Sequence, residues 1–165
     1  MNSNLQFIKK VAVVMGSQSD FETMKHAVEI LEKLEIEYDV KVISAHRTPE
    51  RLYSFAKFAH ENYCCIIAGA GGAAHLPGMI SSMSFLPIFG VPVNATSLNG
   101  LDSLLSIVQM PGGIPVSTMS IGISGAKNAG LSVAAIIALY DERIKRNLIA
   151  FRQNQTDAVK EEVKN

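Results

Sequence analysis

The chain has 165 residues, 15 of them basic and 15 acidic, so its formal net charge at neutral pH is zero. A neutral chain lacks the positive field that attracts nucleic acid, and we expect no nucleic-acid partner. Charged residues make up only 18% of the sequence, below the roughly 25% of typical soluble proteins, which favours additional surface buried between subunits.

Length and apolar runs bound the class of protein further. A chain of this length is expected to form one domain, residues 1–165, that buries roughly 70% of its unfolded surface. The longest apolar runs, residues 64–74 and 131–140, fall short of the ~18 residues that suggest a membrane span. The basic pair near the start precedes only five apolar residues, too few for a secretion signal. We therefore expect a cytoplasmic protein with no membrane partner.

The first part of the chain predicts two strands and a helix after a frayed start, residues 1–6. The unbroken apolar run Val11–Val14 is typical of a strand buried on both faces. Phe21–Leu34 has apolar residues at helical spacing after the cap residue Ser19, and it is expected to be an amphipathic helix. Tyr38–Ile43 predicts the second strand.

The second helix has a clear start. Thr48 is a cap residue, Pro49 takes the first helical position and Glu50 places an acid in the first turn. Asn62 is expected to close this helix in the left-handed conformation. An apolar stripe should face the core: Leu52, Phe55, Ala56, Ala59 and Tyr63.

The remaining elements alternate in the same way. They are strand Cys64–Ala68, short helix Leu76–Met83, strand Leu86–Val91 ending at Pro92, helix Leu101–Val108 and strand Ser117–Ile121. A long helix is predicted from Asn128 to about Phe151. Beyond it, a polar helical tail, residues 152–165, either reaches a neighbouring subunit or lies on the surface of its own.

Cys64 and Cys65, the two cysteines, are adjacent in a predicted strand. Successive strand side chains point to opposite faces, so neither a disulfide nor a shared metal site is expected. We interpret both as small apolar residues.

Small or polar loops follow the first three predicted strands, at Met15–Asp20, Ser44–Pro49 and Gly69–Leu76. The carboxyl ends of parallel strands meet at one edge of an open α/β sheet, where ligands bind. The sequence therefore predicts a three-layer αβα sandwich with a flavodoxin-like parallel sheet and a site at that edge.

The third loop formally matches the Gly-x-Gly-x-x-Gly/Ala dinucleotide motif. That motif belongs after the first strand and needs an acidic residue about 20 positions later, whereas here no acid occurs between Ala74 and Asp102. No Gly-x-x-x-x-Gly-Lys-Ser/Thr motif occurs either, which argues against a nucleoside triphosphate. The loop instead favours close approach of a small ligand to the backbone.

The first two loops carry groups that bind anions and transfer protons. Ser17 and Asp20 stand where a helix begins, a place that attracts phosphate, although helix capping accounts for them equally well. Arg47 is suited to pairing with an anion, and beside it His46 is of the type whose charge changes near neutral pH. His75 fits a helix cap and a ligand contact equally.

Four segments together resemble the bacterial PurE family of purine biosynthesis: Gly16–Asp20, Ser44–Pro49, Ala68–Met79 and Ser106–Pro111. The resemblance runs from about Val11 into the C-terminal helix, in order and with matching spacing. It implies an isomerase, N5-carboxyaminoimidazole ribonucleotide mutase, which moves a carboxylate from the exocyclic nitrogen to ring carbon 4 without ATP, metal or cofactor. By the same resemblance, the reaction would proceed through CO2 and aminoimidazole ribonucleotide.

The resemblance also implies roles for single residues. His46 would shuttle the proton, and Asp20 would hold the ribose hydroxyls. The 5′-phosphate would be held by Ser17, Ser44 and Arg47. The Gly/Ala loop would enclose CO2. Further contacts with the substrate would come from Gly71, Ala73, His75 and Leu76. Family members form octamers with a swapped C-terminal helix, which implies a homo-octamer.

Two alternatives stay open. A related branch of the family carboxylates aminoimidazole ribonucleotide directly with CO2, although the loop at residues 110–116 looks more like the mutase branch. A flavodoxin-like module that binds flavin mononucleotide is the alternative from a different class. The absence of tryptophan and the scarcity of aromatic residues near the strand ends disfavour flavin stacking.

Overall fold

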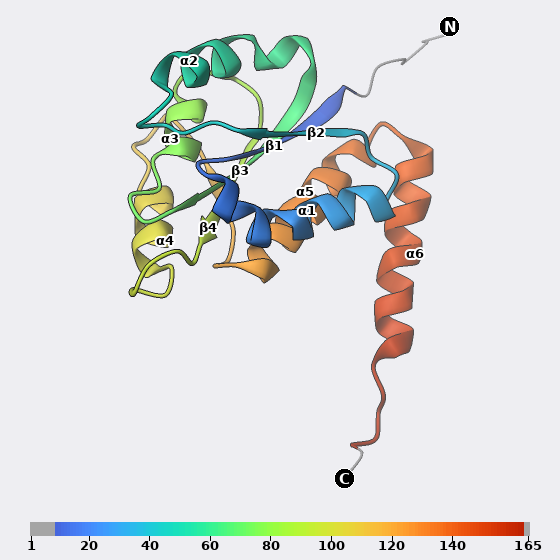
Figure 1. Ribbon diagram of the computed structural model, residues 1–165. Helices are drawn as coiled ribbons and strands as arrows, with labels where there is room; N and C mark the ends of the chain where they lie inside the picture. The colour runs from blue at the N-terminus through green and yellow to red at the C-terminus, as the bar shows by residue number, and fades with distance from the viewer. Residues whose placement is uncertain (1–8, 164–165) are drawn as a thin grey trace, which may run out of the picture.

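The computed structural model, which describes residues 9–163, has a five-stranded parallel sheet between two layers of helices (Figure 1). The predicted frayed start, residues 1–6, lies outside the described residues. The strands are β1 (Lys10–Met15), β2 (Tyr38–Val42), β3 (Tyr63–Gly71), β4 (Ile88–Val93) and β5 (Ser117–Thr118). The helices are α1 (Phe21–Lys33), α2 (Pro49–Phe58), α3 (Leu76–Ser81), α4 (Leu101–Val108), α5 (Ile123–Ile137) and α6 (Glu142–Ala158), with 3-10 turns η1 (Gln18–Asp20) and η2 (Ala59–Glu61).

The strand order β2-β1-β3-β4-β5 confirms the predicted flavodoxin-like sheet. Strand β2 lies on one side of β1 in the sheet, and β3 lies on the other side. The loops after β1 and β3 therefore diverge and open a crevice at the carboxyl edge of the sheet.

Two hydrophobic cores confirm the three layers. Val11, Val13 and Met15 of β1 pack with α1, α5 and α6 on one face of the sheet. Ala12 and Val14 pack with α2, α3 and α4 on the other. The alternation follows from the two-residue period of a strand, and both faces of β1 are apolar because both are covered.

The predicted long helix at residues 128–151 is wrong: it is two helices, α5 and α6, joined at residues 138–141 (Figure 1). The Asp141 carboxylate accepts the backbone N–H groups of Arg143 at 2.8 Å and Ile144 at 3.2 Å, so it caps a new helix. Helix α6 ends at Ala158, and residues 159–163 of the predicted helical tail are not helical.

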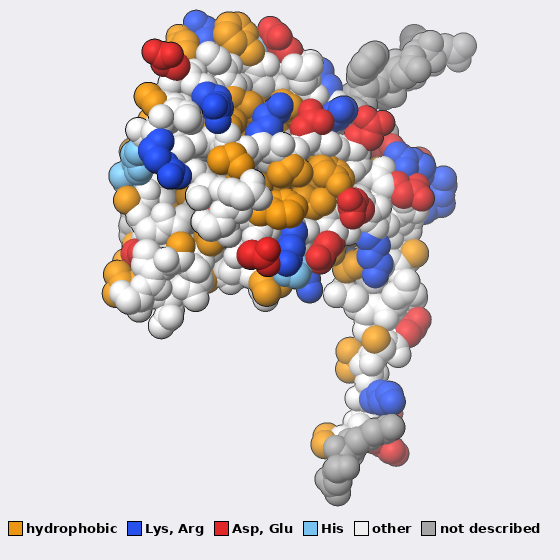
Figure 2. All heavy atoms as spheres, viewed as in Figure 1, with side chains coloured by type: hydrophobic (Ala, Val, Ile, Leu, Met, Phe, Trp, Pro, Cys, Tyr) orange, Lys and Arg blue, Asp and Glu red, His pale blue; other side chains and the backbone are white. Residues whose placement is uncertain are grey.

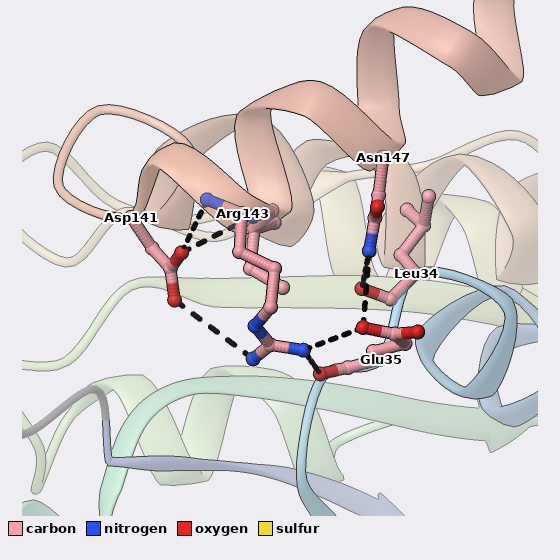
Figure 3. Close-up of polar contacts among 6 residues, drawn as sticks. Leu34, Glu35, Asp141, Arg143 and Asn147 are labelled. Carbon is pink, nitrogen blue, oxygen red and sulfur yellow. Dashed lines mark hydrogen bonds and ion pairs between the residues drawn. The ribbon is translucent and has the colours of Figure 1, made fainter.

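Helix α6 is attached to the turn between α1 and β2 (Figure 3). Ile144 and Leu148 are buried in the core beside α1 and α5. Around them, the Arg143 guanidinium donates to the Glu35 carbonyl and carboxylate at 3.1 and 2.8 Å, and the Asn147 amide donates to the Leu34 carbonyl at 3.2 Å. The rest of α6 extends away from the sheet (Figure 1).

Two strands run further than predicted. β3 continues through Gly71, so the first part of the Gly/Ala segment is strand rather than loop. β4 continues past Pro92 to Val93. The Pro92 carbonyl faces the β5 side, where it accepts the Gly122 N–H at 2.8 Å, and β5 has already ended at Thr118. The missing N–H of proline therefore breaks no ladder hydrogen bond.

Other boundaries differ by a few residues. α3 ends at Ser81, and β5 spans two residues instead of five. Asn62 has a φ of −117° and is not left-handed, because the η2 turn closes α2 and the Asn62 N–H donates to the Ala59 carbonyl. Ser19 does not cap α1: the η1 turn intervenes, and the Ser19 hydroxyl donates to Ser17 Oγ at 3.1 Å.

The two cysteines lie on one face of the sheet, contrary to prediction. Lys10 pairs with Tyr63 and Val11 pairs with Cys65, so Cys64 is an extra residue in a β-bulge. Both cysteines are free thiols. Cys65 is buried in the core beside α1 and α5, and Cys64 is partly buried and packs against that core. None of the helices within residues 9–163 is long and apolar enough to cross a membrane.

Candidate functional site

A cavity of about 380 Å³ opens at the carboxyl edge of the sheet, between the loops that follow β1, β2 and β3. This volume lies within the range of small-molecule sites. The cavity brings together all nine residues predicted from the sequence: Ser17, Asp20, Ser44, His46, Arg47, Gly71, Ala73, His75 and Leu76.

The loop after β2 is folded on itself and pinned to the loop after β1. The Thr48 hydroxyl donates to the Ser44 carbonyl at 2.9 Å and accepts the Ser44 N–H at 3.0 Å, so Thr48 braces this loop instead of capping α2. Arg47 Nε donates to Ser44 Oγ at 3.1 Å, and Arg47 Nη2 donates to the Gly16 carbonyl at 3.1 Å. The guanidinium is thus fixed between the two loops, and Arg47 lines the same cavity as Ser17.

Asp20 is the acidic residue of the cavity and is only 6% exposed. Its Oδ2 accepts the Ser17 N–H at 2.9 Å. Burial raises the pKa of this carboxyl above its ordinary value, outweighing the backbone hydrogen bonds from Ser17 and Gly16 and the charge of Arg47, all of which lower the pKa. Asp20 therefore offers the cavity a hydrogen-bond acceptor that is poorly solvated.

His46 and His75 meet across the cavity. Nε2 of His46 lies 2.7 Å from Nδ1 of His75, and the rings are perpendicular with centroids 4.9 Å apart. This contact needs an N–H on one nitrogen and a lone pair on the other, so at least one of the two atoms is unprotonated while it exists. His75 holds the cap position of α3 but makes no side-chain capping hydrogen bond, which favours its predicted role as a ligand contact.

The Gly/Ala loop forms the wall opposite Arg47. Gly71 fits closely: a Cβ at this position would lie 2.5 Å from the Cβ of Ala95. Gly72 has a φ of +64°, which favours glycine. Within residues 9–163, the N–H groups of Ala73 and Ala74 donate to no protein acceptor. The loop therefore has backbone donors to offer a ligand.

Sequence reasoning missed some of the lining. Ala95 follows β4 and lies at the same carboxyl edge, so the strand-end rule could have found it. Ser19 was interpreted as a cap alone, yet it lines the cavity. Ser103 and Ser106 of α4 hold the Gly/Ala loop through hydrogen bonds to Gly72, and no local pattern marks them.

No group of three or more His, Cys, Asp or Glu side chains in the described part of the chain is placed to hold a metal ion. The polar groups of the cavity are instead hydroxyls, one guanidinium, one carboxyl and two imidazoles.

Comparison with known sequences decides the family. Residues 10–158 match the sequence model of the family described as AIR carboxylase. The chain belongs to the AIR carboxylase family. The match covers all six helices and all five strands of the described residues, so the AIR carboxylase assignment applies to the sheet, the cavity and helix α6 together.

Relatives within the AIR carboxylase family are similar over nearly their whole length. The N5-carboxyaminoimidazole ribonucleotide mutase of Brucella melitensis is 58% identical over 156 residues, which are 94% of this chain and 96% of that protein. The Escherichia coli K12 protein of the same name is 56% identical over 153 residues, 92% and 90% of the two chains. The crystal structure of Treponema denticola PurE superposes with a TM-score of 0.80 at 28% identity, covering 89% of this chain and 91% of that one. These matches confirm the resemblance to PurE.

Proposed function

We propose that the protein is an N5-carboxyaminoimidazole ribonucleotide mutase, an isomerase of purine biosynthesis. The observation that carries this proposal is the single cavity in which a proton-transfer pair, an anion-binding arginine and a small-residue loop face one another. The names of relatives at 56–58% identity support it.

Phosphate and ribose would be held by the loops after β1 and β2. Arg47 supplies a guanidinium oriented by Ser44, and Ser17 supplies a hydroxyl at the start of η1. Asp20, buried and poorly solvated, would accept hydrogen bonds from the ribose hydroxyls. These groups bind parts of the substrate that do not react, so they orient the imidazole toward His46.

His46 would carry the proton in both halves of the reaction. It protonates the exocyclic nitrogen as the bond from that nitrogen to the carboxylate carbon breaks and CO2 is released. Ring carbon 4 then forms a bond to CO2, and its proton returns to His46, so the proton count is unchanged after one turnover. The contact with His75 at 2.7 Å would orient the His46 ring for both transfers.

The Gly/Ala loop would retain CO2 between the two halves. CO2 is small and apolar, and Gly71 and Ala73 provide a wall with little side-chain volume. The free N–H groups of Ala73 and Ala74 would stabilise the carboxylate as it forms. Retention matters because an escaped CO2 converts a fast intramolecular return into a second-order reaction.

An ultraviolet assay of the purified protein tests the proposal. One tube contains fresh N5-carboxyaminoimidazole ribonucleotide without ATP or added bicarbonate, and a parallel tube contains aminoimidazole ribonucleotide with bicarbonate. Fast formation of the carbon-carboxylated product in the first tube is expected. Product in the second tube alone would identify a direct carboxylase, and a yellow protein with bound flavin would support the flavin alternative.

We further propose that the protein is a cytoplasmic homo-octamer. The C-terminal part of the chain extends away from the body of the molecule and carries hydrophobic side chains (Figure 2). In helix α6, Ile149 is 60% exposed. Helix α4 has a second exposed apolar stripe, formed by Leu101, Leu105 and Val108. Contact between copies would cover both surfaces. The two free cysteines fit a reducing compartment.

A further inference from the structure

Ser103 is a buried polar residue that the proposed chemistry leaves without a role. It lies in the first turn of α4 and is completely buried. Its hydroxyl donates to the Val93 carbonyl at 2.8 Å and accepts the Gly72 N–H at 2.9 Å. One hydroxyl thus joins the end of β4 to the loop that follows β3.

A second serine holds the other side of the same loop residue. Ser106 Oγ lies 3.3 Å from the Gly72 carbonyl, while its shorter bond, 2.7 Å, goes to the Asp102 carbonyl of its own helix. Gly72 is therefore bonded at its N–H by Ser103, and its carbonyl has a longer contact with Ser106, whose single hydroxyl proton it shares with the Asp102 carbonyl. We call Ser103, Ser106 and Gly72 the serine clamp.

The serine clamp determines which N–H groups of the loop are left without a protein acceptor. Because Ser103 occupies the N–H of Gly72, that donor is not available to a ligand, whereas those of Ala73 and Ala74 have no protein acceptor within residues 9–163. Gly72 takes its φ of +64° at this point, and its neighbours Gly71 and Ala73 line the cavity. The clamp therefore holds the peptide at which the loop turns into the cavity wall.

From this geometry we infer that Ser103 is a positioning residue that keeps the Gly/Ala loop closed over CO2. The inference rests on the proposed mutase function. Without the Ser103 hydroxyl, the Gly72 N–H and the Val93 carbonyl both lose a buried partner, and the loop gains freedom to reorient. CO2 would then leave before ring carbon 4 captures it, and aminoimidazole ribonucleotide would accumulate.

The expected signature separates positioning from binding. Phosphate and ribose are held by the loops after β1 and β2, which Ser103 does not touch, so the KM of the Ser103→Ala variant should stay within about twofold of the unaltered enzyme. Its kcat for the carbon-carboxylated product should fall about tenfold. The fraction of turnovers that end as aminoimidazole ribonucleotide and free CO2 should rise severalfold.

The experiment measures both products from fresh N5-carboxyaminoimidazole ribonucleotide, with an enzyme-free blank for spontaneous decarboxylation. Ser81→Ala is the matched control, because Ser81 is also buried and its hydroxyl donates to the Pro115 carbonyl at 2.6 Å, outside the cavity lining. This control should keep the product ratio of the unaltered enzyme. If Ser103→Ala does not fold, Gly72→Ala loosens the same clamp, since alanine disfavours a φ of +64° although its Cβ has room 3.6 Å from Thr96.

An unchanged product ratio in the folded clamp variant would overturn the inference, and so would an equal rise in Ser81→Ala. Failure of the unaltered enzyme to turn over the substrate would overturn the mutase proposal itself and the positioning role with it. The two kinds of failure can be told apart. A product ratio can be compared between variants only if the unaltered enzyme is active, whereas the mutase proposal fails if the unaltered enzyme is inactive.

Discussion

The side chain to which we assign proton transfer is half of a histidine pair. His46 follows the braced loop after β2, and its Nε2 lies 2.7 Å from Nδ1 of His75. A positioned acid–base group contributes roughly 10²- to 10⁴-fold to rate. At the scale of the residue, the proposed chemistry therefore depends on one imidazole.

Replacing His46 with asparagine should abolish most turnover without loss of binding. The amide keeps polarity but transfers no proton, so kcat should fall by about 10²- to 10⁴-fold. Calorimetric affinity for the nucleotide product should stay within a few fold, since Arg47 and Asp20 are unchanged. His26→Asn is the control, because His26 lies on α1, pairs with Glu29 and does not line the cavity. Full activity in His46→Asn would remove it from the proton-transfer role.

Asp20 is expected to favour binding of the nucleotide but to lower the stability of the fold. Burial raises the pKa of its carboxyl, so between the ordinary pKa of 3.8 and the raised pKa the folded chain holds more of this proton than the unfolded chain does. This group therefore lowers the unfolding free energy as pH rises from 3.8 through the raised pKa, and the penalty is complete once the pH exceeds the raised pKa.

Asp20→Asn should remove that penalty, because an amide can still accept the Ser17 N–H but carries no charge. We expect a higher Tm than that of the unaltered protein at pH 7, and a difference that narrows toward pH 3.8. Affinity for the nucleotide should weaken at the same time. A Tm difference that is largest at acid pH would contradict this assignment.

At the scale of the element, α6 is anchored at its first two turns. Ile144 is 1% exposed, and the contacts around it, between Arg143 and Glu35 and between Asn147 and Leu34, tie the helix to the end of α1 (Figure 3). Exposed ion pairs of this kind contribute little, typically 0–1 kcal/mol. The buried isoleucine should therefore supply most of the attachment.

Truncating Ile144 to alanine should lower the free energy of unfolding by about 2–5 kcal/mol, the range for a large apolar side chain deleted from a core. Lys145→Ala, one residue further along and exposed, loses only the pair with Glu142 and should change it by roughly 0.5 kcal/mol or less. Denaturant titrations of both variants provide the test. Equal effects would show that the polar contacts, not the core, hold α6.

At the scale of the whole molecule, the exposed apolar surface on α4 and α6 should be covered by other copies. Light scattering at micromolar concentration should give about 142 kDa, eight times the 17.8 kDa chain. The substitution Ile149→Glu would place a charge at an exposed apolar position of α6. Oligomers smaller than the octamer should then appear, while the far-ultraviolet circular dichroism spectrum stays that of the unaltered protein. A mass of 17.8 kDa for the unaltered protein would contradict the octamer.

The sequence by itself determined the layered fold and most of the residues that line the cavity. Apolar runs and helical spacing are local patterns, and the rule that parallel strands end at one edge places Ser17, His46 and Gly71 together without any coordinates. These residues do line one cavity. The helix break at Asp141 was also in the sequence as a capping residue, but the apolar pattern running through it concealed the cap.

Only the tertiary structure decided features that depend on residues far apart in the chain. The contact between His46 and His75 joins two loops, the Ser103 hydroxyl joins α4 to both β4 and the Gly/Ala loop, and the bulge at Cys64 depends on how β3 pairs with β1. None of these has a local periodicity, because a hydrogen bond across 29 or 31 positions follows from how layers pack. Sequence patterns indicate which face of a helix or strand a residue lies on, and tertiary packing decides which residues it contacts there.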